Sequence, residues 1–281
     1  MTSPITIVTG TSSGIGLQIA VQSAAAGHTV VATMRDLAKA APLRDAAAAL
    51  GVTVDIRQLD VTDPVSVDAC VTSVVGDYGR IDALVNNAGA GHVGTIENES
   101  VDDVRRVMEV NFFGVVAASK AAMPHLRASG GRLVTVTSVG GAVGQPFSEA
   151  YCAAKFAVEG FMQSLAPVAS TVGVRVSVVE PGAVASEFVP NIGLASAAMV
   201  ADAGPYGPAL GAYLARSGTS FANAQSSESA AAAIVAVLTA DAPPLRAQTS
   251  DGARAFVGAS LGDLDGSAVL GMTRTWVAAE S

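Results

Sequence analysis

Cysteine, lysine and charged residues in general are scarce in this chain. Of its 281 residues, two are cysteines (Cys70 and Cys152), three are lysines, and 14% are Asp, Glu, Lys or Arg. Two cysteines exclude a disulfide framework and a structural zinc site, and they favour a protein of the reducing cytosol. The hydrophobic content of 50% excludes a disordered chain, and the length suits one large domain or two small ones.

Positive charge is also in deficit. The formal net charge is −8 at pH 7, which argues against binding to nucleic acid or to an anionic membrane. Residues 1–34 are uncharged, but they lack a basic start and contain a Gly- and Ser-rich turn, so they fit neither a signal peptide nor a membrane span. His28, His92 and His125 lie in unrelated segments, so no metal site is expected. We therefore expect a cytoplasmic protein.

Short, continuous apolar runs alternate with helix-length segments along most of the chain. Such runs are typical of parallel strands that helices cover on both faces. Strands are expected at Ile5–Thr9, Thr29–Met34, Thr53–Leu59, Ile81–Asn86, Arg132–Thr137 and Val174–Glu180. Helices are expected at Ile15–Ala26, Leu37–Leu50, Val65–Tyr78, Val101–Ser129 and Ala150–Thr171. This alternation predicts right-handed β-α-β units and an α/β fold, a doubly wound parallel sheet of the Rossmann type, in one domain of residues 1–281.

The regular pattern fails between residues 186 and 227, where Gly, Pro, Ala and Ser dominate. Irregular stretches of this length often serve as lids. We therefore expect residues 186–227 to be an insertion that covers the substrate, and the alternative is a variable surface loop. Beyond it, a last helix is expected at Ser226–Ala240, followed by a Pro-rich turn and a weak final strand.

A glycine-rich turn connects the first expected strand to the first expected helix. It reads Thr9-Gly10-Thr11-Ser12-Ser13-Gly14-Ile15-Gly16. Glycines at such a turn let the backbone approach a pyrophosphate, and the N-terminus of the following helix offers free N–H groups to the phosphate charge. The spacing differs from the usual G-x-G-x-x-G, so the turn taken alone is either a dinucleotide site or simply a tight loop.

Tyr151 and Lys155 are four residues apart in an expected helix, which puts both side chains on one face. A nearby ammonium group favours the phenolate form of tyrosine. Lys155 is therefore expected to lower the pKa of Tyr151 from its usual value of about 10 toward the working range of an acid/base catalyst. The other interpretation, a surface pair without function, is disfavoured by the scarcity of lysine.

Further motifs accompany these two in a consistent order. Asn86-Asn87-Ala88-Gly89 follows the fourth expected strand, Asn111 lies in a long helix, Ser138 ends the fifth strand, and Pro181-Gly182 follows the sixth. On these residues the chain resembles the short-chain dehydrogenases/reductases up to about Phe188. The stretch from Ser138 through Pro146-Phe147 to Gly160 is most similar to the branch that contains type-1 17β-hydroxysteroid dehydrogenase and the retinol dehydrogenases.

The resemblance implies a role for each matching residue. Ser138 would donate to the reacting oxygen, Tyr151 would pass the proton, and Lys155 would hold the nicotinamide ribose. Asn111 would hold a relay water. Two donors on a carbonyl oxygen that becomes an alkoxide agree with this assignment. The cofactor would lie against Gly10, Thr11, Ser12, Ser13, Gly14, Ile15, Gly16, Arg35, Asp60, Val61, Asn87, Ala88, Gly89, Tyr151, Lys155, Pro181, Gly182, Val184 and Ser186.

The end of the second expected strand bears on the choice between NAD and NADP. A carboxylate there accepts bonds from the ribose 2′-hydroxyl of NAD, whereas an arginine accommodates the 2′-phosphate of NADP. In the family's register the acid would stand at Met34, which cannot accept, and Arg35 follows it. Asp36 has the spacing of an NAD-selecting acid but is expected to cap the next helix. NADP is the expected cofactor and NAD the alternative.

Apolar side chains in and around the insertion predict a small hydrophobic carbonyl or alcohol substrate, with a steroid-like molecule as the leading candidate. They are Phe188, Val189, Ile192, Leu194, Met199, Tyr206, Leu210, Tyr213, Leu214 and Phe221, and several are equally well explained as helix core. The family pairs its two long helices across a two-fold axis, which implies a homodimer or homotetramer. The alternative function is a dinucleotide-sensing regulatory protein that keeps the fold without catalysis.

Overall fold

The structure, a computed structural model, describes residues 3–185, 197–222 and 224–278. Seven parallel strands form one sheet in the order β3-β2-β1-β4-β5-β6-β9. They are β1 (Ile5–Thr9), β2 (Thr29–Met34), β3 (Asp55–Gln58), β4 (Ala83–Asn86), β5 (Arg132–Val136), β6 (Arg175–Glu180) and β9 (Arg246–Gln248). A two-stranded sheet pairs β7 (Val184–Ala185) with β8 (Gln225–Ser226). The doubly wound parallel sheet expected from the sequence is confirmed.

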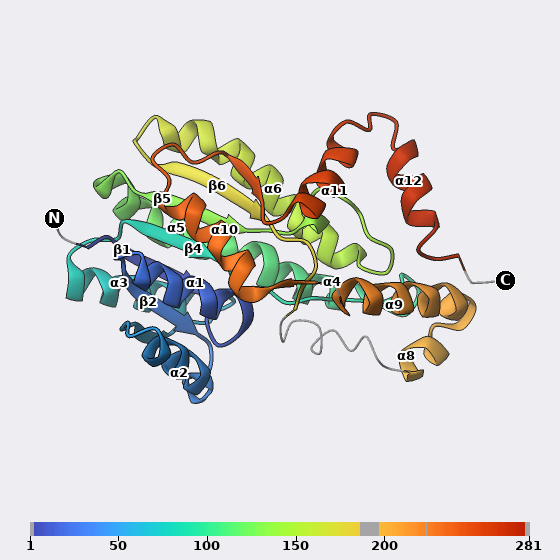
Figure 1. Ribbon diagram of the computed structural model, residues 1–281, viewed down its shortest axis with the longest axis horizontal. Coiled ribbons are helices and arrows are strands. Elements are labelled where there is room, and N and C mark those ends of the chain that lie inside the picture. Colours follow the sequence, from blue (N-terminus) through green and yellow to red (C-terminus); the bar gives the residue numbers. More distant parts are fainter. Residues whose placement is uncertain (1–2, 186–196, 223, 279–281) are drawn as a thin grey trace.

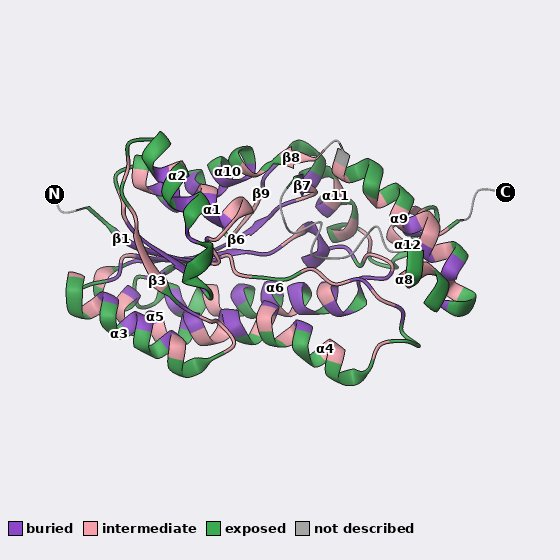
Figure 2. Cartoon of the chain, turned by 90° about the horizontal axis from the view of Figure 1, so that it is seen from below, coloured by how far each residue is buried: buried purple, intermediate pink, exposed green. Residues whose placement is uncertain are grey.

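Helices cover both faces of the large sheet (Figures 1 and 2). One face carries α1 (Gly14–Ala25), α2 (Ala41–Ala49) and α10 (Ser227–Thr239), and the other carries α3 (Pro64–Tyr78), α5 (Gly114–Ser129) and α6 (Glu149–Ser170). Each face has its own apolar core. Because side chains alternate along a strand, Ile7 of β1 packs into the core with α3, α5 and α6, and Val8 into the core with α1, α2 and α10. This double burial explains the continuous apolar runs.

Two expected helices are interrupted. The segment expected as one helix over Leu37–Leu50 begins with a 3-10 turn, η1 (Leu37–Lys39), before α2 starts. The segment expected as one helix over Val101–Ser129 consists of α4 (Val101–Met108), a π-helical turn η2 (Glu109–Phe113), and α5. Single π turns inside helices occur frequently at functional sites, and this one contains Asn111.

The prediction that residues 186–227 lack regular structure is wrong for the described part of that segment. It contains α8 (Ala197–Asp202), η4 (Gly204–Tyr206) and α9 (Gly207–Ala222). Pro205 and Pro208 stand in the first turns of η4 and α9, where a missing N–H costs nothing, and alanine is the best helix former. A composition typical of loops therefore forms helices here. Residues 186–196 lie outside the described part.

Two helices that the sequence analysis did not foresee follow β9. They are α11 (Asp251–Leu261) and α12 (Ser267–Arg274). Ser250 caps α11, because its side chain accepts a hydrogen bond from the N–H of Ala253 at 3.2 Å. These two helices gather with α8 and α9 at one end of the molecule, on the right in Figure 1. Within the described ranges, none of the helices has the length and apolar character that crossing a membrane requires.

Candidate active site

A cleft of about 1110 Å³ opens at the carboxyl ends of the strands. Its walls include residues that directly follow β1, β4 and β6, and side chains of α6, α9 and α11. The strand order runs outward from β1 in both directions, with β2 on one side and β4 on the other. Open α/β sheets bind ligands at this topological switch point.

Close packing requires glycine at two positions of the turn after β1. Gly10 has φ +72°, and a β-carbon there would lie 2.7 Å from Cα of Ala88. A β-carbon on Gly16 would lie 2.1 Å from the carbonyl oxygen of Gly10 and 2.3 Å from Nδ2 of Asn87. Nδ2 of Asn87 donates to the carbonyls of Thr9 and Gly10, both at 3.0 Å. The turn and the end of β4 therefore form one rigid wall.

The N-terminus of α1 faces the cleft without a side-chain cap. Ser13 at the N-cap position makes no capping hydrogen bond, and the first turn holds no acidic residue. The cleft wall at this point is formed by Ser12, Ser13, Gly14, Ile15 and Gly16. Because free N–H groups and the helix dipole attract an anion, the arrangement fits the pyrophosphate of a dinucleotide.

Thr11 does not share this wall, although it was predicted as a cofactor-binding residue. Its side chain is buried, and Oγ1 donates to the carbonyl of Thr33 at 3.1 Å. The hydroxyl thus ties the turn to β2 instead of facing the cleft. A residue between two cleft-lining neighbours in sequence can point the other way, because the direction depends on the backbone of the turn.

Two cations lie on the cleft wall beyond the end of β2. Arg35 and Lys39 are both exposed and line the cleft, as does the buried Met34. The carboxylate of Asp36 accepts from the N–H of Ala38 at 3.0 Å, which confirms the predicted cap. Lys39 was not among the predicted site residues. Its signal in the sequence was a second basic residue one short turn after Arg35.

Ser138, Tyr151 and Lys155, which the family resemblance brought together, all line the cleft. Ser138 precedes a 3-10 turn, η3 (Val139–Gly141), and its Oγ accepts from the N–H of Gly140 at 3.0 Å. The Tyr151 hydroxyl forms a hydrogen bond with Ser138. Nζ of Lys155 lies 5.7 Å from the centre of the Tyr151 ring and donates to the carbonyl of Val136 at 3.4 Å.

Burial governs the charge of this pair. It raises the pKa of Tyr151 to about 12, opposed by the hydrogen bond with Ser138. It lowers the pKa of Lys155 to about 8, opposed by the negative charge of Glu159. The net pKa of Tyr151 is therefore raised instead of lowered as expected, because loss of water from around the phenolate dominates.

Asn111 serves the backbone instead of lining the cleft. Its buried side chain donates from Nδ2 to the carbonyls of Ala90 at 2.9 Å and Val107 at 3.0 Å, and Oδ1 accepts from the N–H of Ala90 at 3.2 Å. A β-carbon on Gly89 would lie 2.9 Å from Oδ1 of Asn111 and 3.4 Å from Nζ of Lys155. In the structure, Asn111 thus fixes the loop that passes beside Lys155, and its two N–H donors are both engaged by main-chain carbonyls rather than turned to a relay water.

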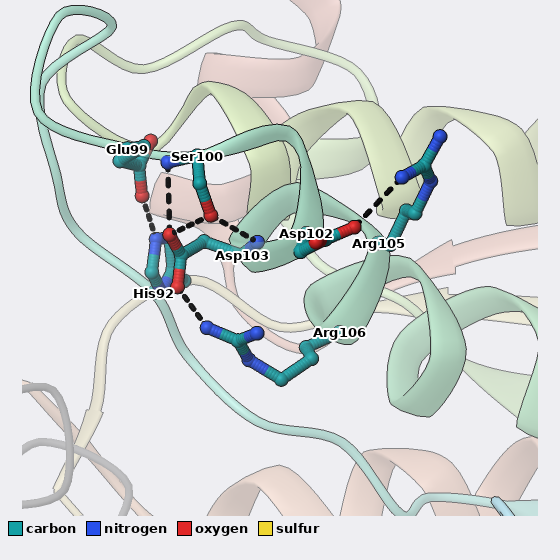
Figure 3. Close-up of polar contacts among 7 residues, drawn as sticks. All are labelled: His92, Glu99, Ser100, Asp102, Asp103, Arg105 and Arg106. Atoms are coloured by element: carbon teal, nitrogen blue, oxygen red, sulfur yellow. Dashed lines mark hydrogen bonds and ion pairs between the residues drawn. The ribbon is translucent and has the colours of Figure 1, made fainter.

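The loop between β4 and α4 forms another part of the cleft wall, and polar contacts among its own residues and the first turns of α4 stabilise it (Figure 3). His92 lines the cleft and contacts the carboxylate of Glu99. Ser100 caps α4 by accepting from the N–H of Asp103 at 3.2 Å, while the Asp103 carboxylate accepts from the N–H of Ser100 at 2.8 Å. Arg106 pairs with Asp103. This network gives the loop a defined shape next to the reacting groups.

The other predicted cofactor residues mostly lie on the cleft wall. Arg35, Asp60, Val61, Asn87, Ala88, Gly89, Pro181, Gly182 and Val184 all line it. The carboxylate of Asp60 is occupied locally, because it accepts from both the N–H and the hydroxyl of Thr62, at 3.0 and 2.7 Å. Ser186 lies outside the described residues.

The apolar residues expected around the substrate divide into two groups. Tyr213 and Phe221 line the cleft. Met199, Tyr206, Leu210 and Leu214 do not line it and pack in the apolar cluster beside it, which also contains Tyr213, Val93, Phe147, Ala203 and Trp276, so they are helix core. Phe188, Val189, Ile192 and Leu194 lie outside the described residues.

Three side chains that the sequence analysis missed complete the wall. Arg216, Phe256 and Trp276 all line the cleft. Cζ of Arg216 lies 5.0 Å from the centre of the Trp276 ring, and Trp276 stacks on Phe256 with centroids 5.8 Å apart. Phe256 and Trp276 come from the unforeseen α11 and the segment after α12, where no motif drew attention to them.

The comparisons with known proteins agree with this geometry. The profile of a family described as short chain dehydrogenase matches residues 4–196. The chain belongs to this family. Retinol dehydrogenase 8 from Homo sapiens is 41% identical over 254 residues, which are 87% of this chain and 80% of the relative. 17-beta-hydroxysteroid dehydrogenase type 1 from Homo sapiens is 40% identical over 199 residues, or 68% of this chain and 60% of the relative.

Solved structures of family members superpose on this short-chain dehydrogenase. One from Streptomyces avermitilis has a TM-score of 0.76 at 30% identity and covers 97% of this chain and 96% of its own. An alcohol dehydrogenase from Thermococcus sibiricus, complexed with 5-hydroxy-NADP, has a TM-score of 0.63 at 28% identity and covers 68% and 80%. The predicted family is confirmed, and so is the predicted class, an oxidoreductase acting on CH–OH groups with NAD(P).

Proposed function

We propose that this short-chain dehydrogenase is an NADP(H)-dependent oxidoreductase that interconverts a hydrophobic ketone and its secondary alcohol, with a steroid-like molecule as the leading candidate. The observation that carries the proposal is the meeting of Ser138, Tyr151 and Lys155 in the same cleft as the uncapped N-terminus of α1. One cleft thus offers both a phosphate cradle and a set of proton donors.

The nicotinamide cofactor, when bound, supplies or accepts the hydride. The hydroxyls of Ser138 and Tyr151 lie within hydrogen-bond reach of each other, so both are suited to donate to a carbonyl oxygen as it gains negative charge. Tyr151 passes a proton to that oxygen in reduction and takes it back in oxidation. Because its pKa is raised to about 12, the phenol is protonated at neutral pH, as a donor must be. Lys155 would hold the nicotinamide ribose.

The preference for NADP(H) is supported by the charges beyond β2. Arg35 and Lys39 offer two cations to a 2′-phosphate, and Met34 offers no acceptor to a 2′-hydroxyl. The carboxylate of Asp36 is engaged with the N–H of Ala38. The NADP analogue bound by the Thermococcus sibiricus relative agrees with this preference. NAD is the alternative cofactor.

The proposal of a hydrophobic substrate is supported by the cleft residues that come from the C-terminal part of the chain. Tyr213, Phe221, Phe256 and Trp276 give the cleft aromatic surface. The relatives are named for retinol and for a steroid, both apolar alcohols. We infer that residues 186–227 form a substrate cover within a single domain of residues 1–281, with α9 as the part of this cover that reaches the cleft.

A homodimer, or a homotetramer built from it, is supported by exposed aromatic side chains. Phe113, Phe156 and Phe161 are 50%, 45% and 36% exposed. The ring of Phe112 lies 5.1 Å from that of Phe113 and 6.1 Å from that of Phe161, which joins part of this surface into one patch. Contiguous exposed apolar patches mark interfaces. A cytoplasmic location stays a prediction.

Oxidation of NADPH by the purified protein tests the proposed function. The assay follows NADPH absorbance with a panel of steroid, retinoid and aliphatic carbonyl compounds, and repeats each with NADH. We expect turnover of at least one apolar ketone, faster with NADPH. If NADPH binds but no carbonyl compound is reduced and no alcohol oxidised, the alternative of a dinucleotide-sensing regulatory protein is favoured instead.

A further inference from the structure

Behind Lys155, three more charged side chains meet where α6 packs on β6 and β9. Glu159 lies one helical turn after Lys155, and each is 4% exposed. Glu180 ends β6 and is 0% exposed, and Arg246 begins β9. None of Glu159, Glu180 and Arg246 lines the cleft. Buried charges are costly unless they are paired, so this cluster needs a physical reason.

Glu159 connects the two elements that carry the proton donors. Its Oε1 accepts from Oγ1 of Thr137 at 2.6 Å, and Thr137 directly precedes Ser138. Its Cγ packs on Gly141, where an added β-carbon would lie 3.0 Å away. Because Glu159 shares α6 with Tyr151 and Lys155, its carboxylate fixes the Ser138 segment against the helix face that carries them.

Arg246 holds the other oxygen of Glu159. Its Nη2 and Nε donate to Oε2 at 2.9 and 3.3 Å, and Nε also lies 3.1 Å from Oε1 of Glu180. Nε2 of Gln248 donates to the second oxygen of Glu180 at 2.5 Å. Two buried carboxylates therefore face one guanidinium. The group as a whole needs a further cation or a proton to balance its charge.

Lys155, one helical turn before Glu159 on α6, is a buried cation that can meet part of this need. Burial favours its neutral form, and the charge of Glu159 opposes this by favouring the ammonium form. Burial and the neighbouring Glu159 also raise the pKa of Glu180, while Arg246 lowers it. Among the described residues, the titratable groups facing this pair are Tyr151 on the cleft side and Glu180 and Arg246 behind.

We propose that Glu159 is a positioning residue of the active site, which keeps Lys155 in its ammonium form and aligns Ser138 with Tyr151, while Arg246 holds Glu159 in place. The inference rests on the proposed function, in which a charged Lys155 holds the cofactor. It assigns a purpose to an ion pair, Glu159 with Arg246, that does not line the cleft.

The scarcity of lysine makes a direct test feasible. The chain holds three lysines, so [13C]lysine labelling gives three side-chain signals, assigned with Lys39→Arg and Lys120→Arg variants. The pH titration of the Lys155 signal is compared in the wild type, Glu159→Gln and Glu149→Gln. Glu149 is the matched control, because it lies exposed on the same helix. No substrate or cofactor is needed.

We expect the Lys155 midpoint to fall by about one pH unit or more in Glu159→Gln, since a nearby opposite charge moves a pKa by about 1–3 units. It should not move in Glu149→Gln. Circular dichroism verifies that each variant is folded. An unchanged midpoint in folded Glu159→Gln overturns the inference.

Arg246→Met provides a second variant with the opposite sign. It leaves Glu159 without its guanidinium, so the field at Lys155 becomes more negative and the midpoint should rise. If Glu159→Gln does not fold, an unmoved midpoint in Arg246→Met overturns the inference instead. The proposed function fails separately, through absence of turnover in the wild type, while the Lys155 titration still reports on Glu159.

Discussion

Nζ of Lys155 lies 5.7 Å from the centre of the Tyr151 ring, one helical turn along α6. An opposite charge within about 4–6 Å favours the phenolate form without a hydrogen bond between the two groups. Burial disfavours the charged form of each group. It raises the pKa of Tyr151 to about 12 and lowers the pKa of Lys155 to about 8. The pH dependence of turnover therefore reports on this pair.

Lys155→Met should weaken NADPH binding and move the pH profile. Alcohol oxidation requires the Tyr151 phenolate, and without the ammonium charge the phenolate is less favourable, so the midpoint for oxidation moves to higher pH. Ketone reduction, which requires the phenol, persists to higher pH for the same reason. Profiles of kcat/KM against pH and Kd values for NADPH test both effects. An unchanged profile in an active variant contradicts the electrostatic role.

Arg35→Ala should remove most of the preference for NADPH over NADH. A charge-assisted bond to phosphate contributes roughly 1.5–3 kcal/mol, or about 10- to 150-fold in affinity. NADPH binding should weaken by that order, with NADH binding nearly unaffected, and Lys39→Ala should act in the same direction more weakly. Met34→Asp should go further, because it adds an acceptor for the 2′-hydroxyl and repels the phosphate.

Lys120→Ala is the matched control for these cofactor variants, because Lys120 is exposed on α5 and does not line the cleft. Kd values for both cofactors should be unchanged in it. Tighter binding of NADH than of NADPH by the wild type, or selective loss of NADH binding in Asp36→Ala, would show that Asp36 is the ribose ligand.

Gly16→Ala should destabilise the protein and weaken NADPH binding at least tenfold. The new β-carbon would lie 2.1 Å from the Gly10 carbonyl and 2.3 Å from Nδ2 of Asn87, so the turn that forms the phosphate cradle must shift. Overpacking of this kind costs about 1–3 kcal/mol. Gly76→Ala on α3 is the control, since a β-carbon there meets nothing within 4 Å. It should stabilise the protein by about 0.5–1 kcal/mol. Equal unfolding free energies and NADPH affinities for the two variants would contradict this account.

Phe113→Glu combined with Phe161→Glu should convert the oligomer into monomers. Both rings are exposed and contact Phe112, so charges there would be buried without a partner in an interface. Light scattering coupled to size-exclusion chromatography measures the mass. Leu270→Glu, at a 50% exposed position on α12, should leave the mass unchanged. A wild-type protein that is monomeric at high concentration contradicts the proposed interface.

The sheet and the reacting groups were predictable because their signals are local. Ile7 and Val8 are consecutive apolar residues that pack into the cores on opposite faces of the sheet. Consecutive apolar residues of this kind are expected only in a strand that is covered on both faces. Tyr151 and Lys155 share a helix face by their spacing alone. Gly16 was predictable as part of the site because it lies in a glycine-rich turn between a strand and a helix, whereas its close packing on Gly10 and Asn87 comes from the structure alone.

The directions of Thr11 and Asn111 were not predictable in the same way. The Thr11 hydroxyl donates to the carbonyl of Thr33, and the Asn111 amide donates to the carbonyl of Ala90. Both partners are distant in sequence, so the sequence does not show that these side chains bond to the main chain instead of facing the cleft. Trp276 and Phe256 were missed because they reach the cleft only through the packing of α11 and α12. The pKa shifts of Tyr151 and Lys155 likewise depend on burial, which could not be predicted from the sequence.

Tyr151→Phe, assayed for NADPH binding and for turnover in parallel, tests the central claim most directly. The substitution removes only the hydroxyl that passes the proton and leaves the ring and Lys155 in place. The account predicts a Kd for NADPH close to that of the wild type and a turnover lowered by about 10²- to 10⁴-fold, the range of acid/base catalysis. A variant that keeps more than about a tenth of the wild-type turnover would contradict the assignment of Tyr151 as the proton donor.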